Sequence, residues 1–186
     1  MEEGPARTCA LVAWIQGLFR DDVPVLVGGA AVELYSGGGY RTGDLDFVGT
    51  VSEDAAKRLE KNGFKRKGGY WIREQGEVFV EFPSAELAAG EASVEIELHG
   101  TTILVISPED LVVDRLAAWQ FWDSQQDAVN AFLVARSTQL DARRLRRNAG
   151  RRQVLKSLEA LTSFLKSYRD ADPTPEVIEQ WARALE

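Results

Sequence analysis

Two aspartates lie close together in the segment VLVGGAAVELYSGGGYRTGDLDFV, which occupies residues 25–48. Asp44 and Asp46 are two residues apart, so on a β-strand both carboxylates would point to the same face of the sheet. Two adjacent carboxylates repel each other unless a positive charge lies between them, and this favours a divalent metal ion. The spacing therefore predicts a metal site at Asp44 and Asp46.

A glycine pair precedes these aspartates, at the point where an apolar run ends and a helix-compatible segment begins. Gly28 and Gly29 would let the backbone approach a ligand closely, because glycine has no side chain to obstruct it. The N-terminus of the following helix would offer free N–H groups to the β- and γ-phosphates of a nucleotide. A phosphate-binding turn and a metal-binding carboxylate pair in one short segment indicate chemistry on a nucleoside triphosphate.

The order of these motifs resembles the nucleotidyltransferase superfamily typified by DNA polymerase beta, in which a glycine-rich helix start precedes a strand carrying Asp-x-Asp. The form here is Gly28-Gly29-Ala30-Ala31 followed by Arg41-Thr42-Gly43-Asp44-Leu45-Asp46. It is most similar to the minimal nucleotidyltransferases, which include abortive-infection-type toxins and small antibiotic-modifying enzymes. The similarity is close over about the first 50 residues and looser through about residue 135.

The resemblance implies transfer of a nucleoside monophosphate from an NTP to an acceptor hydroxyl, with release of pyrophosphate. Asp44 and Asp46 would hold Mg²⁺ or Mn²⁺, and a third acid on a neighbouring strand would complete the site and accept the proton of the hydroxyl. Glu81, near the end of the apolar run 78–82, is the candidate, because an acid in such a run is costly unless it faces solvent or a cation. The alternative is an ordinary acid on the exposed face of a strand. The third acid of the superfamily is often aspartate, so the longer Glu81 departs from the pattern.

The resemblance also implies the partners. The acceptor would be an RNA end, as in a toxin–antitoxin system with an antitoxin protein as partner, or a small molecule. An alternative from another class is a non-catalytic, nucleotide-binding regulatory module, which would follow if Glu81 were misplaced.

Four further residues are candidates for nucleotide binding. Arg41 and Thr42 would either contact the triphosphate or fix the loop that leads to the aspartates. Arg115 and Asp127 stand where toxin-type relatives have a nucleotide-binding lysine and aspartate, but a helix-to-helix salt bridge is the simpler alternative. The lone histidine, His99, lies at an expected turn, and we predict no catalytic role for it.

The C-terminal third contains a basic cluster without an intervening acid. It comprises Arg143, Arg144, Arg146, Arg147, Arg151, Arg152 and Lys156. The cluster indicates either an approach path for RNA or nucleotide phosphates, or the solvated face of a helix. Trp119 and Trp122 are three residues apart on a predicted helix, a spacing more typical of the core than of a base-stacking surface.

The patterns around these residues predict an α+β fold of the polymerase beta-like type, with a small mixed sheet followed by a helical region. Alternating or continuous apolar runs predict strands near residues 23–27, 45–48, 69–82 and 94–106. Ser107 and Pro108 are typical of a helix start, and the chain after them reads as a series of helices. We expect residues 1–106 to form the nucleotidyltransferase core and residues 107–186 to form a helical region packed on it.

Composition limits the classes of protein that fit. The chain has 186 residues, 45% of them hydrophobic, which suffices for a substantial core. A formal net charge of −7 argues against general adhesion to nucleic acid. A single cysteine, Cys9, excludes an internal disulfide, and neither a membrane span nor a secretory signal is evident. We therefore expect a cytoplasmic protein.

Overall fold

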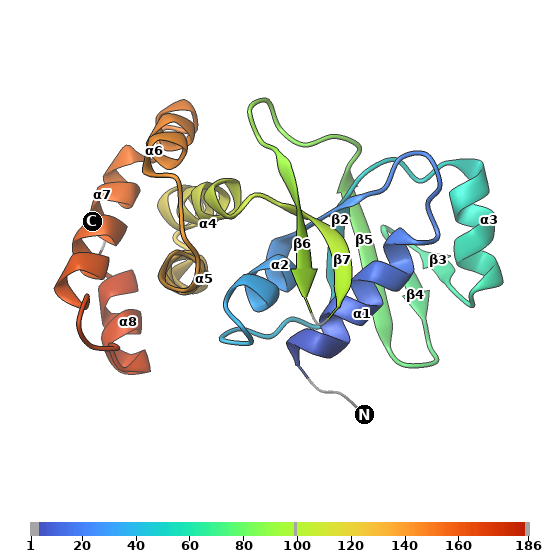
Figure 1. Ribbon diagram of the computed structural model, residues 1–186, viewed down its shortest axis with the longest axis horizontal. Helices are drawn as coiled ribbons and strands as arrows, with labels where there is room; N and C mark the ends of the chain where they lie inside the picture. Colours follow the sequence, from blue (N-terminus) through green and yellow to red (C-terminus); the bar gives the residue numbers. More distant parts are fainter. Residues whose placement is uncertain (1–3, 99, 185–186) are drawn as a thin grey trace. The chain divides into compact units, whose positions relative to one another are not determined.

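The computed structural model describes residues 4–98 and 100–184, so His99 lies outside the described residues. The chain divides into two compact units, one ending at Ser107 and the other beginning at Pro108. The first unit contains the sheet, and the described residues of the second unit form helices but no strand (Figure 1). The fold class is α+β, as the sequence predicts.

The first unit is built on a mixed sheet, which has seven strands in the described part of the chain, in the order β3-β4-β5-β2-β1-β7-β6. The strands are β1 (Val25–Val27), β2 (Leu45–Val48), β3 (Lys65–Lys67), β4 (Tyr70–Arg73), β5 (Val78–Ser84), β6 (Ser93–Leu98) and β7 (Thr101–Ile106). Strand β2 runs antiparallel to β1 and parallel to β5, and β1 runs parallel to β7. The predicted strands are present, and β3 is additional.

One face of this sheet is buried against helices. Leu26 pairs with Phe47 on one side and with Val105 on the other, and all three are completely buried. Helix α1 (Pro5–Gln16) packs on β7, helix α2 (Gly28–Tyr35) packs on β2, and the two helices contact each other. Helix α3 (Glu53–Lys61) follows β2. Its N-cap is Ser52, whose hydroxyl accepts a hydrogen bond from the Ala55 N–H. Because side chains alternate along a strand, the neighbours of these buried residues project from the opposite, open face.

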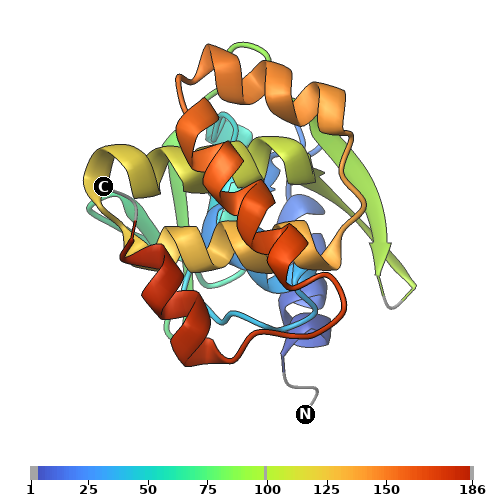
Figure 2. The ribbon, with the colours of Figure 1, turned by 90° about the vertical axis from the view of Figure 1, so that its left-hand side faces the viewer.

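The second unit comprises α4 (Pro108–Trp122), α5 (Gln125–Ser137), α6 (Ala142–Arg151), α7 (Leu155–Ser167) and α8 (Pro175–Ala182), which Figure 2 shows from the side. Its core contains an aromatic cluster in which the rings of Phe164 and Trp181 stack at 4.6 Å and Trp119 lies 4.8 Å from Trp181. The interpretation of Trp122 as a core residue is wrong, because its side chain is 83% exposed. Trp122 is the last residue of α4, three residues beyond Trp119, whose ring contacts Trp181 of α8.

No helix in the described part of the chain is long and apolar enough to cross a membrane.

Candidate active site

Acidic and hydroxyl side chains form a row across the open face of the sheet. Asp46 on β2 pairs with Glu81 on β5, and Glu81 pairs in turn with Tyr70 on β4. Directly paired residues project from the same face with Cβ atoms about 5 Å apart in antiparallel pairs. The register also shifts between Asp46 and Val48, an irregularity of the kind that re-aims side chains at functional edges of sheets. The sheet thus brings together the two acids that lie 35 positions apart in the sequence.

Gly28 allows the Asp46 carboxylate to lie directly against the start of α2. Its φ angle is 67°, in the left-handed region that side chains other than glycine avoid. A Cβ atom at Gly28 would lie 2.1 Å from the Asp46 Oδ2 atom, well inside contact distance. Val27, which precedes it as the N-cap, has no side-chain acceptor to cap the helix. The predicted glycine turn therefore places a carboxylate at a helix N-terminus, where the helix dipole stabilises negative charge.

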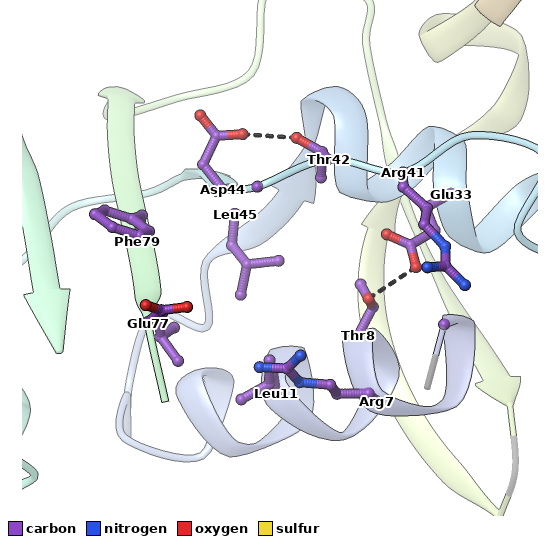
Figure 3. A pocket seen from close by; sticks show the side chains of 13 residues that line it. Arg7, Thr8, Leu11, Glu33, Arg41, Thr42, Asp44, Leu45, Glu77 and Phe79 are labelled. Carbon is purple, nitrogen blue, oxygen red and sulfur yellow. Dashed lines mark hydrogen bonds between the residues drawn. The ribbon is translucent and has the colours of Figure 1, made fainter. Parts of the chain in front are cut away.

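The loop that precedes β2 holds the other predicted aspartate. The Thr42 hydroxyl donates a 2.7 Å hydrogen bond to the Asp44 carboxylate (Figure 3). Gly29 lies beneath this loop, because a Cβ atom there would be 3.0 Å from the Thr42 side chain and 3.1 Å from the Tyr40 ring. Of the two expectations for Thr42, fixing the loop is therefore the one for which the structure contains a contact. Arg41 is exposed beside it.

Tyr70 is the residue at this site that sequence reasoning missed. The negative charge of Glu81 is the largest cause of a raised pKa at the Tyr70 hydroxyl, and the charges of Asp44 and Asp46 add to it. The negative charges of all three predicted acids therefore oppose ionisation of the Tyr70 hydroxyl. In the sequence, Tyr70 is only the first residue of an alternating run, and tyrosine is common in strands.

The carboxylate oxygens of the acids at this site are suitable ligands for a hard cation. Among the residues that the structure describes, no three acidic, histidine or cysteine side chains converge into a complete metal cluster. Mg²⁺ in nucleotide sites does not require one, because it is held by one or two carboxylates together with water and substrate phosphates. Asp46, with Asp44 or Glu81, fits that donor set.

A cavity of about 410 Å³ adjoins Asp44 within the first unit. Its lining includes Arg7 and Arg41, and also Glu33 and Glu77, so charges of both signs face it (Figure 3). Glu33 is only 4% exposed and accepts a 3.1 Å hydrogen bond from the Thr8 hydroxyl. The cavity is therefore a polar space large enough for a small molecule.

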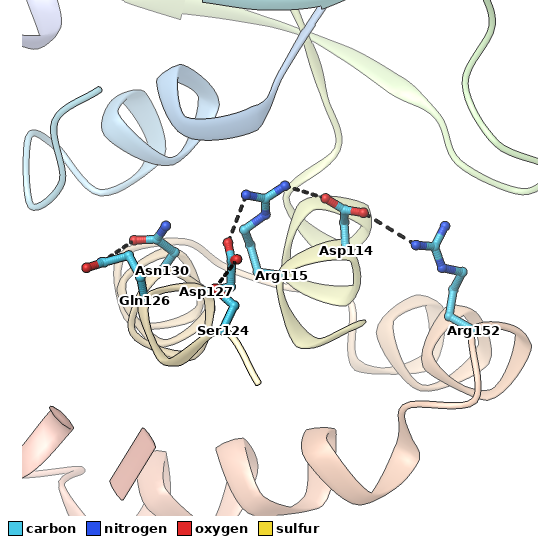
Figure 4. Close-up of polar contacts among 7 residues, drawn as sticks. All are labelled: Asp114, Arg115, Ser124, Gln126, Asp127, Asn130 and Arg152. Carbon is cyan, nitrogen blue, oxygen red and sulfur yellow. Dashed lines mark hydrogen bonds and ion pairs between the residues drawn. The ribbon is translucent and has the colours of Figure 1, made fainter. Parts of the chain in front are cut away.

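In the second unit, Arg115 and Asp127 contact each other. Their side chains are 2.9 Å apart, and Arg115 also pairs with Asp114 at 2.5 Å (Figure 4). Burial opposes the charge of Arg115, but the charges of Asp114 and Asp127 outweigh it and raise the pKa of the guanidinium. Ser124 donates a 2.6 Å hydrogen bond to the second Asp127 oxygen. The pair forms the salt bridge that was the simpler alternative, and nucleotide contact by these residues stays a prediction.

The basic cluster is partly committed to contacts within the second unit. Arg144 pairs at 2.5 Å with Asp110, whose side chain is 1% exposed. Arg152 lies 3.4 Å from Asp114, and Arg146 lies 4.0 Å from Glu159. Arg143, Arg147 and Arg151 are exposed. Some arginines of the cluster therefore form ion pairs within the second unit, and others are exposed to solvent.

Comparison with known proteins supports a nucleotidyltransferase-like fold. No protein-family model and no curated protein matches the chain. Among solved structures, an antigenic nucleotidyltransferase-like protein from Paracoccidioides brasiliensis aligns with a TM-score of 0.57 and 16% identity, over 93% of this chain and 95% of its own. The antibiotic-resistance factor ANT(2'')-Ia aligns with a TM-score of 0.50 and 15% identity, over 88% and 95%. At these identities the likeness concerns the fold.

Proposed function

We propose that the protein is a metal-dependent nucleotidyltransferase that moves a nucleoside monophosphate from an NTP to an acceptor hydroxyl. The observation that carries this proposal is the placement of Asp46. Its carboxylate lies over Gly28 at the start of α2 and opposite Glu81 on the parallel strand β5. A carboxylate pair beside a helix N-terminus suits a nucleotide with its cation, and the nucleotidyltransferase-like fold supports the same function.

Each residue has a role that follows from its position. The N–H groups at Gly28 and Gly29, in the first turn of α2, would bind the β- and γ-phosphates. Asp44 and Asp46 would hold Mg²⁺, with Thr42 orienting the Asp44 carboxylate through its hydrogen bond. When bound, the divalent cation supplies charge neutralisation to the attacking and leaving oxygens. Arg41 and the pair Arg115 and Asp127 are further proposed nucleotide contacts.

Glu81 would accept the proton of the attacking hydroxyl. The acceptor oxygen forms a bond to the α-phosphorus as the bond to the bridging oxygen of the β-phosphate breaks, and pyrophosphate leaves. A glutamate at this position reaches further than an aspartate. Its half-buried side chain lies on the open face beside Asp46, where a substrate hydroxyl would have access to it.

We propose a small polar molecule as the acceptor in preference to an RNA end. The cavity beside Asp44 has room for such a molecule, and its arginines and glutamates suit an acceptor that carries polar or charged groups. The basic cluster, in contrast, uses Arg144 to compensate the buried Asp110. An RNA acceptor and a toxin–antitoxin role with an antitoxin partner remain the alternative within this class.

The test compares the parent protein with Asp46→Asn, which keeps the size of the side chain and removes its charge. Each labelled NTP is incubated with Mg²⁺ and either a small-molecule extract or total RNA, and pyrophosphate release and label transfer are measured. We expect transfer by the parent protein and a loss of at least about 100-fold in the variant, as for a misplaced catalytic group. Transfer by Asp46→Asn at the parent rate would refute the metal assignment. NTP binding without pyrophosphate release would favour the regulatory binding module.

A further inference from the structure

Tyr70 extends the row of functional side chains beyond Glu81. Its partner on β5 is Glu81, and its partner on β3 is Lys67, so the paired row runs Lys67, Tyr70, Glu81, Asp46 across four strands. Tyr70 and Glu81 are directly opposite each other in the antiparallel pair, so their side chains project side by side from the open face. The Glu81 carboxylate also lies beside the turn that begins β4, because a Cβ atom at Gly69 would be 3.5 Å from the Glu81 Oε1 atom.

The position of Tyr70 suggests a reaction of this side chain, and this inference rests on the proposed function. If Glu81 accepts the proton of the acceptor, a hydroxyl on the side chain next to Glu81 on the open face stands where an acceptor hydroxyl would approach. Tyr70 is the direct cross-strand partner of Glu81, and its side chain remains 38% exposed, so a nucleotide has access to it. We infer that Tyr70 is itself an acceptor, and that the protein nucleotidylates its own Tyr70 when it is given an NTP and a divalent cation.

The reaction balances without a further reagent. The Tyr70 phenolic oxygen forms a bond to the α-phosphorus, and the bond from that phosphorus to the β-phosphate oxygen breaks. The phenolic proton passes to Glu81, and pyrophosphate leaves with the electron pair of the broken bond. The product is a tyrosyl phosphodiester, which carries one nucleoside monophosphate on the protein.

The surroundings of Tyr70 suit this substrate. Lys65, Arg66 and Lys67 on the neighbouring strand are all exposed and bring positive charge to the side of Tyr70 away from the acids. Lys67 pairs loosely with Glu74 at 3.5 Å, and both side chains are largely exposed. Exposed cations of this kind attract a triphosphate at long range. Gly68 and Gly69 leave the approach open, since a Cβ atom at Gly68 would meet nothing within 4 Å.

Modification of Tyr70 would also limit the enzyme. A nucleotidyl group on the phenolic oxygen would fill the space in front of Glu81 and keep other acceptors from the base. Preincubation with NTP and Mg²⁺ should therefore lower the later rate of transfer to an added acceptor, in proportion to the fraction of chains modified.

The experiment measures the mass of the intact protein after incubation with each NTP and Mg²⁺, followed by removal of the metal with EDTA and peptide mapping. The chain has four tyrosines, so the assignment needs a matched control. Tyr70→Phe removes only the phenolic oxygen, and Tyr168→Phe makes the same change in the second unit. Asp46→Asn and Glu81→Gln keep Tyr70 but disable its proposed partners.

We expect an adduct that approaches one nucleotidyl group per chain, on Tyr70, in the parent protein and in Tyr168→Phe. It should be absent from Tyr70→Phe and reduced at least about 100-fold in Asp46→Asn and Glu81→Gln. An adduct on another residue, or no adduct in a preparation that binds Mg²⁺–NTP and transfers to an added acceptor, would overturn this inference and leave the proposed function intact. A protein that neither binds Mg²⁺–NTP nor releases pyrophosphate would overturn both.

Discussion

Replacement of Gly28 by alanine tests the proposed active site through the smallest possible change. The new Cβ atom would lie 2.1 Å from the Asp46 Oδ2 atom, whereas ordinary van der Waals contact begins at 3.4 Å. The carboxylate must therefore move by more than 1 Å, and a displacement of that size costs an enzyme about 100-fold in rate. The φ angle of 67° adds a backbone cost of about 1–2 kcal/mol, because a Cβ atom is strained in the left-handed region.

Gly37→Ala separates these two effects. Gly37 has a φ angle of 62°, close to that of Gly28, but a Cβ atom there would meet nothing within 4 Å. Both variants should lose about 1–2 kcal/mol of unfolding free energy in urea titrations. Only Gly28→Ala should lose about 100-fold in nucleotidyl transfer and bind Mg²⁺ more weakly in calorimetry. Equal transfer rates in the two folded variants would refute the reasoning that Asp46 must lie against the start of α2.

Three further predictions concern single contacts. Thr42→Val removes the hydroxyl that orients Asp44 and should lower the transfer rate about 10-fold to 100-fold, whereas Thr42→Ser should restore most of it; equal rates in the two variants would contradict the role. Arg144→Leu removes the cation beside the buried Asp110 and should cost about 2–3 kcal/mol in urea unfolding, less than a fully buried pair because Arg144 is partly exposed. The exposed Arg143→Leu, its control, should change stability by less than about 0.5 kcal/mol. Two backbone N–H groups at the start of α6 lower the pKa of Asp141, so its contribution to stability is present above the unfolded-state pKa and is lost as pH falls through the lower folded-state value. Thermal unfolding should therefore show a steeper loss of stability towards acid for the parent protein than for Asp141→Asn, and parallel pH curves would contradict this.

The sequence was sufficient to propose the three acids as site residues because their signal is local. The prediction of Asp44 and Asp46 rests on alternation along one strand, although Asp44 lies in the loop just before β2. The prediction of Glu81 rests on the cost of an acid in an apolar run. The row that contains Tyr70 depends instead on the register between β4, β5 and β2. The alternation of β4 sets the face from which Tyr70 projects, but the residue opposite Tyr70 is set by the pairing with β5, which β4 alone does not specify. Tyr70 was therefore beyond prediction from the sequence alone.

Strand β3 and the basic cluster show a similar limit. Strand β3 consists of Lys65, Arg66 and Lys67, and all three are exposed, so no apolar alternation marks it. It exists because it pairs with β4 at the edge of the sheet, where lysine and arginine are well tolerated. In the basic cluster, likewise, composition alone does not distinguish Arg144 from its exposed neighbours. The distinction arises from Asp110, 34 positions earlier in the chain.

The glycine pair shows how structure changes the meaning of a motif. The sequence suggests that Gly28 and Gly29 leave space for phosphate, but that space already contains the Asp46 carboxylate at Gly28 and the Thr42 and Tyr40 side chains at Gly29. The missing side chains therefore let the helix start, the strand and the loop approach one another. In the proposed function, phosphate binding would then depend on the N–H groups of the helix and on a cation at Asp46, because a triphosphate and a carboxylate repel each other. For this reason we expect Mg²⁺ and the NTP to bind together, each weakly without the other.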